Sequence, residues 1–66
     1  MTKEELKKFE RALENMERAL ESAEIKKAFL VEHDFEAETM LWTSKIQAYD
    51  FCICELRYVI RNIKLE

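Results

Sequence analysis

Apolar residues recur along the chain at alternating spacings of three and four, the period of a helix that packs against another helix. In the first half this row comprises Leu6, Phe9, Leu13, Met16, Leu20, Ala23, Lys27 and Leu30. In the second half a row of the same period comprises Phe35, Thr39, Trp42, Ile46, Tyr49, Ile53, Leu56, Ile60 and Ile63. The pattern predicts two helices, over about residues 3–31 and 35–64.

The period is interrupted once, at about residues 32–34, where the row steps five residues from Leu30 to Phe35. We expect a turn here, with His33 capping the last carbonyls of the first helix and Asp34 acting as N-cap of the second. The predicted fold is all-α, a single coiled-coil-like antiparallel hairpin over residues 1–66, dimeric or packed on a helical partner. Its predicted core is Leu6, Phe9, Leu13, Met16, Leu20, Leu30, Trp42, Ile46, Tyr49, Ile53, Leu56, Ile60 and Ile63. Because glycine is absent, one long helix in an extended coiled coil is the alternative.

The second predicted helix carries another row of the same period, roughly opposite the first. Its apolar members are Met40, Phe51, Cys54, Tyr58 and Leu65, and we predict that they bind a partner. One hairpin of this size cannot cover both rows, so a second copy or a different protein is expected on this one. The competing interpretation reverses the faces, so that Phe51 and Tyr58 lie against the first helix.

Three local features add to this picture. Thr2 and Glu5 have the spacing of a capping box at the start of the first helix. Ile25, Ala28 and Phe29 fall outside the first row, and we expect the start of the second helix to cover them; alternatively they extend the partner surface. Cys52 and Cys54 are two apart on a helix, which is unsuited to a shared metal or a disulfide, so we interpret them as small buried hydrophobes.

Charge and composition exclude several function classes. Residues 1–31 carry seven basic and seven acidic side chains and residues 32–66 carry four and seven, without the basic cluster that nucleic-acid binding needs. No apolar run approaches the ~20 residues of a membrane span, and the N-terminus lacks a signal-peptide pattern, so we expect a cytoplasmic protein. The single histidine, His33, has no second ligand at a suitable spacing. We therefore expect no metal, no cofactor and no enzymatic activity.

The residue order of the second predicted helix resembles that of the E-type cochaperones of type III secretion needle subunits, the YscE/PscE/EscE-like family. The resemblance is carried by Trp42, Ala48, Asp50, Ile53, Leu56, Arg57, Tyr58, Val59, Ile63 and Lys64. It covers roughly the C-terminal half of the chain. The first helix agrees only in being amphipathic and charged, and this chain has Glu32-His33-Asp34 where the family has glycine in the connector.

This resemblance implies a cytoplasmic helical hairpin without catalytic role. Members of the family pair with a larger, tetratricopeptide-like G-type chaperone, and the pair keeps the needle subunit soluble before export. The second apolar row would then be covered by the G-type chaperone, or by a second copy in its absence. The alternative function is a homodimeric regulatory or RNA-binding hairpin, which requires basic and aromatic residues on one face of the first helix.

Overall fold

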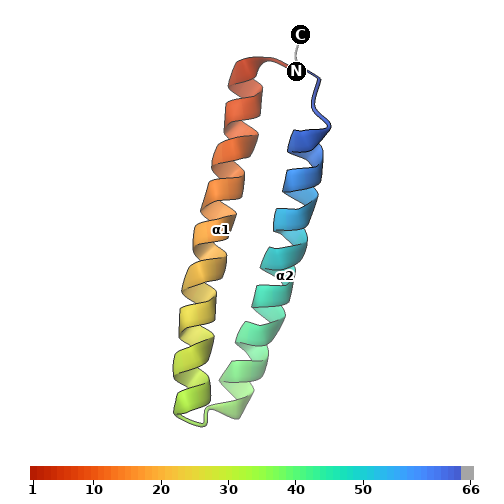
Figure 1. Ribbon diagram of the computed structural model, residues 1–66. Coiled ribbons are helices and arrows are strands. Elements are labelled where there is room, and N and C mark those ends of the chain that lie inside the picture. The colour runs from red at the N-terminus through yellow and green to blue at the C-terminus, as the bar shows by residue number, and fades with distance from the viewer. Residues whose placement is uncertain (65–66) are drawn as a thin grey trace.

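Two antiparallel helices lie side by side in the computed structural model, which describes residues 1–64 (Figure 1). Helix α1 comprises Lys3–Glu32 and helix α2 comprises Glu36–Arg61. The hairpin is 52 Å long and 14 × 11 Å in cross-section, and the Met1 amino group returns to within 3.3 Å of the Lys64 carbonyl oxygen. The predicted all-α hairpin is confirmed, and the turn after α1 excludes one continuous helix.

The capping box predicted at the start of α1 is present. The Glu5 backbone N–H donates to the Thr2 hydroxyl at 3.2 Å, and the Thr2 backbone N–H donates to the Glu5 carboxylate at 3.2 Å. The Thr2 hydroxyl also donates to that carboxylate, at 3.0 Å. Because these donors, the backbone N–H first, favour the ionised form, they hold the pKa of Glu5 below its ordinary value. Thr2 and Glu5 thus satisfy backbone groups that the first turn leaves free.

The turn closes α1 with backbone hydrogen bonds alone. Asp34 adopts a left-handed conformation, with φ 60°, and its N–H donates to the Val31 carbonyl at 3.2 Å. The Phe35 N–H donates to the Leu30 carbonyl at 3.0 Å, and the two bonds together make a Schellman motif. Glycine usually occupies the left-handed position because it has no Cβ, and aspartate is one of the few other residues that tolerate it.

The prediction that Asp34 caps α2 was wrong. The N-cap of α2 is Phe35, which supplies no side-chain hydrogen bond, because Asp34 is used one residue earlier to end α1. His33 is the C-cap of α1: its backbone N–H donates to the Phe29 carbonyl at 3.2 Å. Its ring stacks on the Phe29 ring, with centroids 4.2 Å apart.

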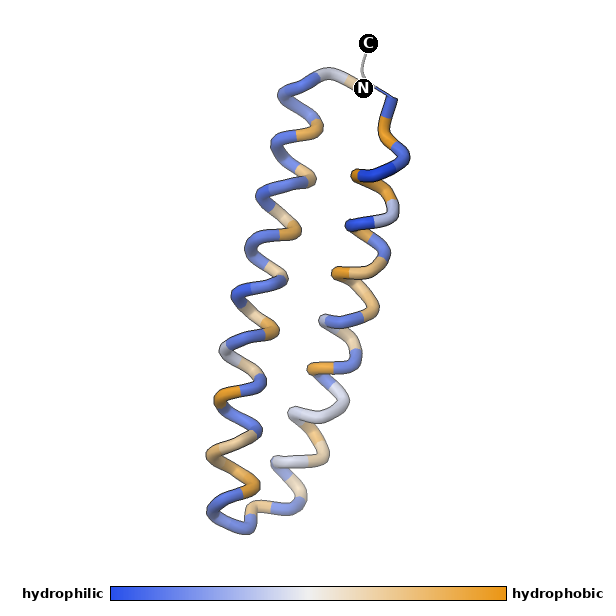
Figure 2. Tube along the Cα trace, in the orientation of Figure 1, coloured by the Kyte–Doolittle hydropathy of each residue, from blue (hydrophilic) through white to orange (hydrophobic). Residues whose placement is uncertain are grey.

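The core is a single seam between the two helices, and apolar positions recur along the facing sides of both (Figure 2). All thirteen residues of the predicted core are buried or half-buried. Leu30 and Ile53 are the most enclosed of them, at 6% and 4% exposed, and the small side chain of Ala23 allows close approach beside the seam. Most of the seam is only half-buried, because two helices cannot enclose a side chain from all directions.

Within residues 1–64, an ion pair joins the two helices across the seam. The Arg57 guanidinium donates to the Glu17 carboxylate at 3.2 Å, and both side chains are about half exposed. Exposed pairs of this kind typically contribute ~0.2–1 kcal/mol. The pair therefore helps to define the register of α1 against α2 more than it stabilises the hairpin.

Candidate partner-binding surface

The side of α2 that points away from α1 is largely apolar and open to solvent. We call this surface the α2 outer face; its apolar members are Met40, Leu41, Ala48, Phe51, Tyr58 and Val59, and the exposed polar residues Ser44 and Glu55 lie between them. Met40, Phe51 and Tyr58 are 72%, 67% and 61% exposed, and Leu41 and Val59 are also exposed. The surface follows from the pattern of the sequence, because a helix that is apolar on two sides can turn only one of them to a single neighbour.

Charge distinguishes this face from the corresponding face of α1. The α1 positions that point away from the seam in the first five turns are Lys7, Arg11, Glu14, Arg18 and Glu21, all charged and all exposed. Between Thr39 and Val59, in contrast, α2 carries four charged residues, Lys45, Asp50, Glu55 and Arg57, of which Glu55 lies on the outer face. Interface centres are depleted of charge relative to other surface. The composition of α2 is therefore typical of a helix with a neighbour on both sides.

The total exposed area leads to the same interpretation. The chain exposes 5457 Å², whereas about 4,450 Å² is typical of a compact monomer of 8.0 kDa. The excess is about 1,000 Å², and a standard protein interface buries about 800 Å² on each partner. One interface on this hairpin would bring its exposed area to that of an ordinary globular chain.

The sequence-predicted partner residues are only partly brought together. Met40, Phe51 and Tyr58 share the α2 outer face, whereas Cys54, also exposed, borders the opposite side and lines a groove with Glu17, Glu21 and Asp50. Leu65 lies outside the described residues. The interpretation of Cys54 as buried was wrong, since one helix partner leaves its position open, and Cys52 is half-buried.

Leu41 and Val59 belong to the surface but were missed by the sequence prediction. Each directly follows a member of the predicted row, Met40 or Tyr58, so the exposed apolar surface is wider than one heptad position. A search for an apolar stripe wider than one residue per turn, rather than for a single row, would have included both residues.

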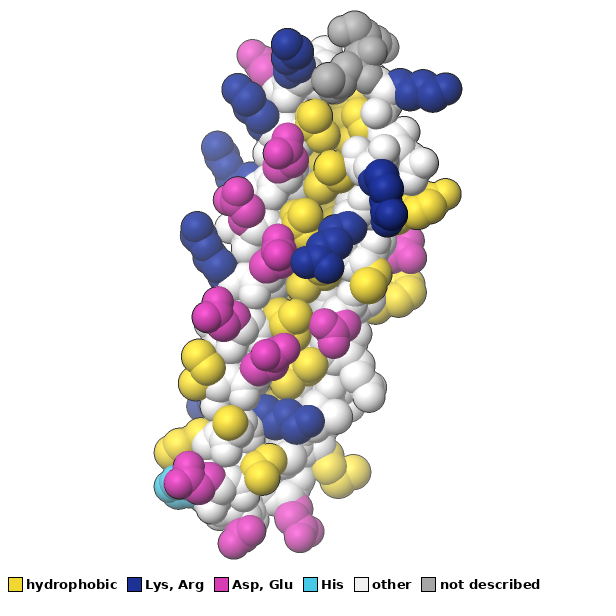
Figure 3. Space-filling view, viewed as in Figure 1, with side chains coloured by type: hydrophobic (Ala, Val, Ile, Leu, Met, Phe, Trp, Pro, Cys, Tyr) yellow, Lys and Arg dark blue, Asp and Glu magenta, His cyan; other side chains and the backbone are white. Residues whose placement is uncertain are grey.

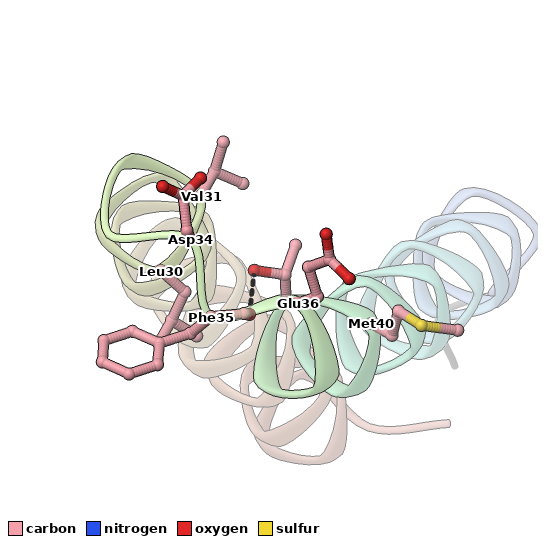
Figure 4. A pocket seen from close by; sticks show the side chains of 7 residues that line it. Leu30, Val31, Asp34, Phe35, Glu36 and Met40 are labelled. Atoms are coloured by element: carbon pink, nitrogen blue, oxygen red, sulfur yellow. Dashed lines mark hydrogen bonds between the residues drawn. The ribbon is translucent and has the colours of Figure 1, made fainter.

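A second apolar area surrounds the turn. Ile25, Ala28 and Phe29 are exposed, so the expectation that the start of α2 covers them was wrong. The reason is the direction of α2, which leaves the turn along the seam while Ile25 and Phe29 point away from it. Beside the turn, a shallow groove of about 360 Å³ is bordered by exposed Val31, Phe35 and Met40 (Figure 4).

Acidic side chains gather along α1 beside the seam (Figure 3). Glu17, Glu21 and Glu24 line a groove of about 320 Å³ with Asp50 of α2, and Leu20 and Ile53 also line it. Arg57 is the one basic residue of that lining. The groove is predominantly acidic and continuous with the apolar seam.

Within residues 1–64, no three His, Cys, Asp or Glu side chains gather in a way that suits a metal ion. Neither α1 nor α2 combines the length and apolarity needed to cross a membrane. Comparison with protein-family models, curated proteins and solved structures gives no match to this chain.

Proposed function

We propose that this chain is a cochaperone of a type III secretion system that binds a tetratricopeptide-like G-type chaperone through the α2 outer face and helps to keep the needle subunit soluble before export. The observation that carries the proposal is a largely apolar face on α2, with Glu55 as its charged member, that no residue of α1 covers. Exposed apolar area of this kind is typical of a surface that binds another molecule.

Two further features support the proposal. Eight of the ten residues on which the resemblance to E-type cochaperones depends lie on α2, and Ile63 and Lys64 follow its end. The eight include Ala48, Tyr58 and Val59 of the outer face. A concave groove of helical repeats binds a partner helix by its apolar side chains, as in other helix-in-groove complexes. In that complex Phe51 and Tyr58 act as anchors, since aromatics at interface centres dominate binding energies.

The RNA-binding alternative has less support. The exposed face of α1 alternates lysine or arginine with glutamate, and no aromatic residue accompanies them in its first five turns beyond the half-buried Phe9. Phosphate backbones require clustered positive charge.

The test is co-expression with candidate chaperones from neighbouring open reading frames, followed by capture on a tagged hairpin. We expect Phe51→Glu to abolish the complex, because burial of this ring is worth ~1.5–3 kcal/mol, or about ten- to hundredfold in affinity, before the added cost of a buried charge. Asn15→Glu is the matched control, since it adds the same charge at an exposed position of α1. Circular dichroism establishes that both variants remain helical.

Failure of every candidate chaperone to bind would contradict the proposal, as would a complex that survives Phe51→Glu. Salt-dependent binding of structured RNA by the isolated chain would favour the RNA-binding regulator instead. A solubility assay of the needle subunit, with and without the hairpin, tests the chaperone role separately from the contact.

A further inference from the structure

We propose that, without another partner, the α2 outer face pairs with the α2 outer face of a second copy, antiparallel, about a two-fold axis between Ala48 and Phe51. This inference goes beyond the proposed function, because it concerns the isolated chain and requires no chaperone. It assigns the occupant of the surface, the orientation of the two helices and their register.

The spacing of the residues along the middle of the α2 outer face is symmetric. Leu41, Ser44, Ala48, Phe51, Glu55 and Tyr58 follow one another at three, four, three, four and three residues. A two-fold axis perpendicular to a helix pairs each residue of one copy with the residue of the second copy that lies equally far on the other side of the axis. In a symmetric row, every residue therefore meets another member of the same row. The pairs across the axis are Ala48 with Phe51, Ser44 with Glu55, and Leu41 with Tyr58, each formed twice.

The side chains in these layers are complementary in size. Phe51 is large and two-thirds exposed, and it faces the small Ala48 of the second copy, which leaves room for the ring. Leu41 faces Tyr58, which joins two exposed apolar side chains. Alternation of large and small residues across facing positions is what allows helices to interdigitate.

Lys45 borders the row and Glu55 belongs to it, and their charges are complementary in the same register. Lys45 and Glu55 are the charged residues on that side of α2 between Leu41 and Val59, and the antiparallel pairing brings Lys45 of each copy beside Glu55 of the other. In the hairpin the Lys45 Nζ lies 4.3 Å from the centre of the ring of Trp42, a seam residue, so the pairing requires the Lys45 side chain to turn from that ring toward the second copy. Each dimer then contains two equivalent ion pairs, one on either side of the contacts between Phe51 and Ala48.

A parallel pairing lacks these features. It places Lys45 beside Lys45 and Glu55 beside Glu55, which is repulsive. It also sets Phe51 against Phe51 and Ala48 against Ala48, so that large meets large and small meets small. The antiparallel register removes the like-charge contacts and the contact of Phe51 with Phe51, and the excess area of about 1,000 Å² is sufficient for one such interface, which buries about 800 Å² on each partner.

The test is a charge exchange on the isolated full-length chain. By sedimentation equilibrium at micromolar to millimolar concentration, we expect the unmodified chain to form a dimer of twice the 8.0 kDa chain mass. Lys45→Glu and Glu55→Lys should each weaken the dimer about tenfold. The double variant Lys45→Glu/Glu55→Lys should restore it. Lys45 and Glu55 are too far apart on one helix to meet within a chain, so restoration requires contact between copies.

Steric variants test the register separately from charge. Ala48→Phe should block the dimer because it fills the space that Phe51 of the second copy occupies, while the exposed position of Ala48 leaves the hairpin itself unaffected. Circular dichroism at low concentration checks that each variant keeps its helicity.

A chain that stays monomeric up to millimolar concentration overturns the inference, and so does a dimer that tolerates Ala48→Phe or is not restored by the charge exchange. None of these outcomes bears on chaperone capture, which the co-expression experiment measures independently.

Discussion

Replacing Ile53 by alanine should destabilise the hairpin more than any comparable change on the α2 outer face. Ile53 is the most enclosed of the large side chains in the described residues, at 4% exposed. An isoleucine-to-alanine change in a core typically costs ~2–5 kcal/mol, with the upper values found where a closed cavity remains. Ile53 also lines the open groove beside Glu17 and Asp50, so water and neighbouring side chains can fill part of the space. We therefore expect about 2–3.5 kcal/mol.

That loss is large for a chain of this size. At roughly 0.05–0.15 kcal/mol per residue, 66 residues give an unfolding free energy of about 3–10 kcal/mol. For domains of this length, each kcal/mol shifts the melting temperature by about 4–8 °C. Ile53→Ala should consequently lower the melting temperature by roughly 8–28 °C.

Phe51→Ala is the matched control. Phe51 is 67% exposed, so its truncation removes little intrachain burial although it deletes more atoms. Urea and thermal unfolding are followed by circular dichroism at several dilutions, and the variants are compared where the midpoint no longer depends on concentration. If Phe51→Ala costs as much as Ile53→Ala under these conditions, the two faces of α2 are reversed and the reasoning fails.

Two further predictions concern the ends of α1. Asp34→Gly should raise the urea midpoint and Asp34→Val should lower it, with about 1–2 kcal/mol between the two variants, because only glycine adopts the left-handed conformation without a Cβ penalty. Thr2→Ala should cost about 1 kcal/mol through loss of the N-cap. Because the pKa of Glu5 is lowered in the fold, its stabilisation is complete above the unfolded pKa and is lost as pH falls through the folded pKa. Unfolding curves at neutral and acidic pH should therefore show a smaller acid-induced loss in Thr2→Ala than in the unmodified chain.

The sequence by itself determined the two helices and the seam between them. The alternating spacing of three and four places Leu13, Met16, Ile46 and Ile53 on the facing sides, and this periodicity depends only on the geometry of the α-helix. The capping box of Thr2 and Glu5 was equally predictable, since its hydrogen bonds form within one turn. The second apolar side of α2 also followed, because two apolar sides cannot both face one neighbour.

Other features depend on the direction in which α2 leaves the turn, and the periodicity of the sequence does not specify that direction. The conformation of Asp34 assigned that residue to the end of α1, and no local pattern distinguishes this from an N-cap because aspartate suits both positions. The path of α2 out of the turn left Ile25 and Phe29 uncovered, and it left Leu41 and Val59 exposed beside Met40 and Tyr58. Exposure of a side chain depends on what lies across from it, and that neighbour is fixed only when the two helices meet.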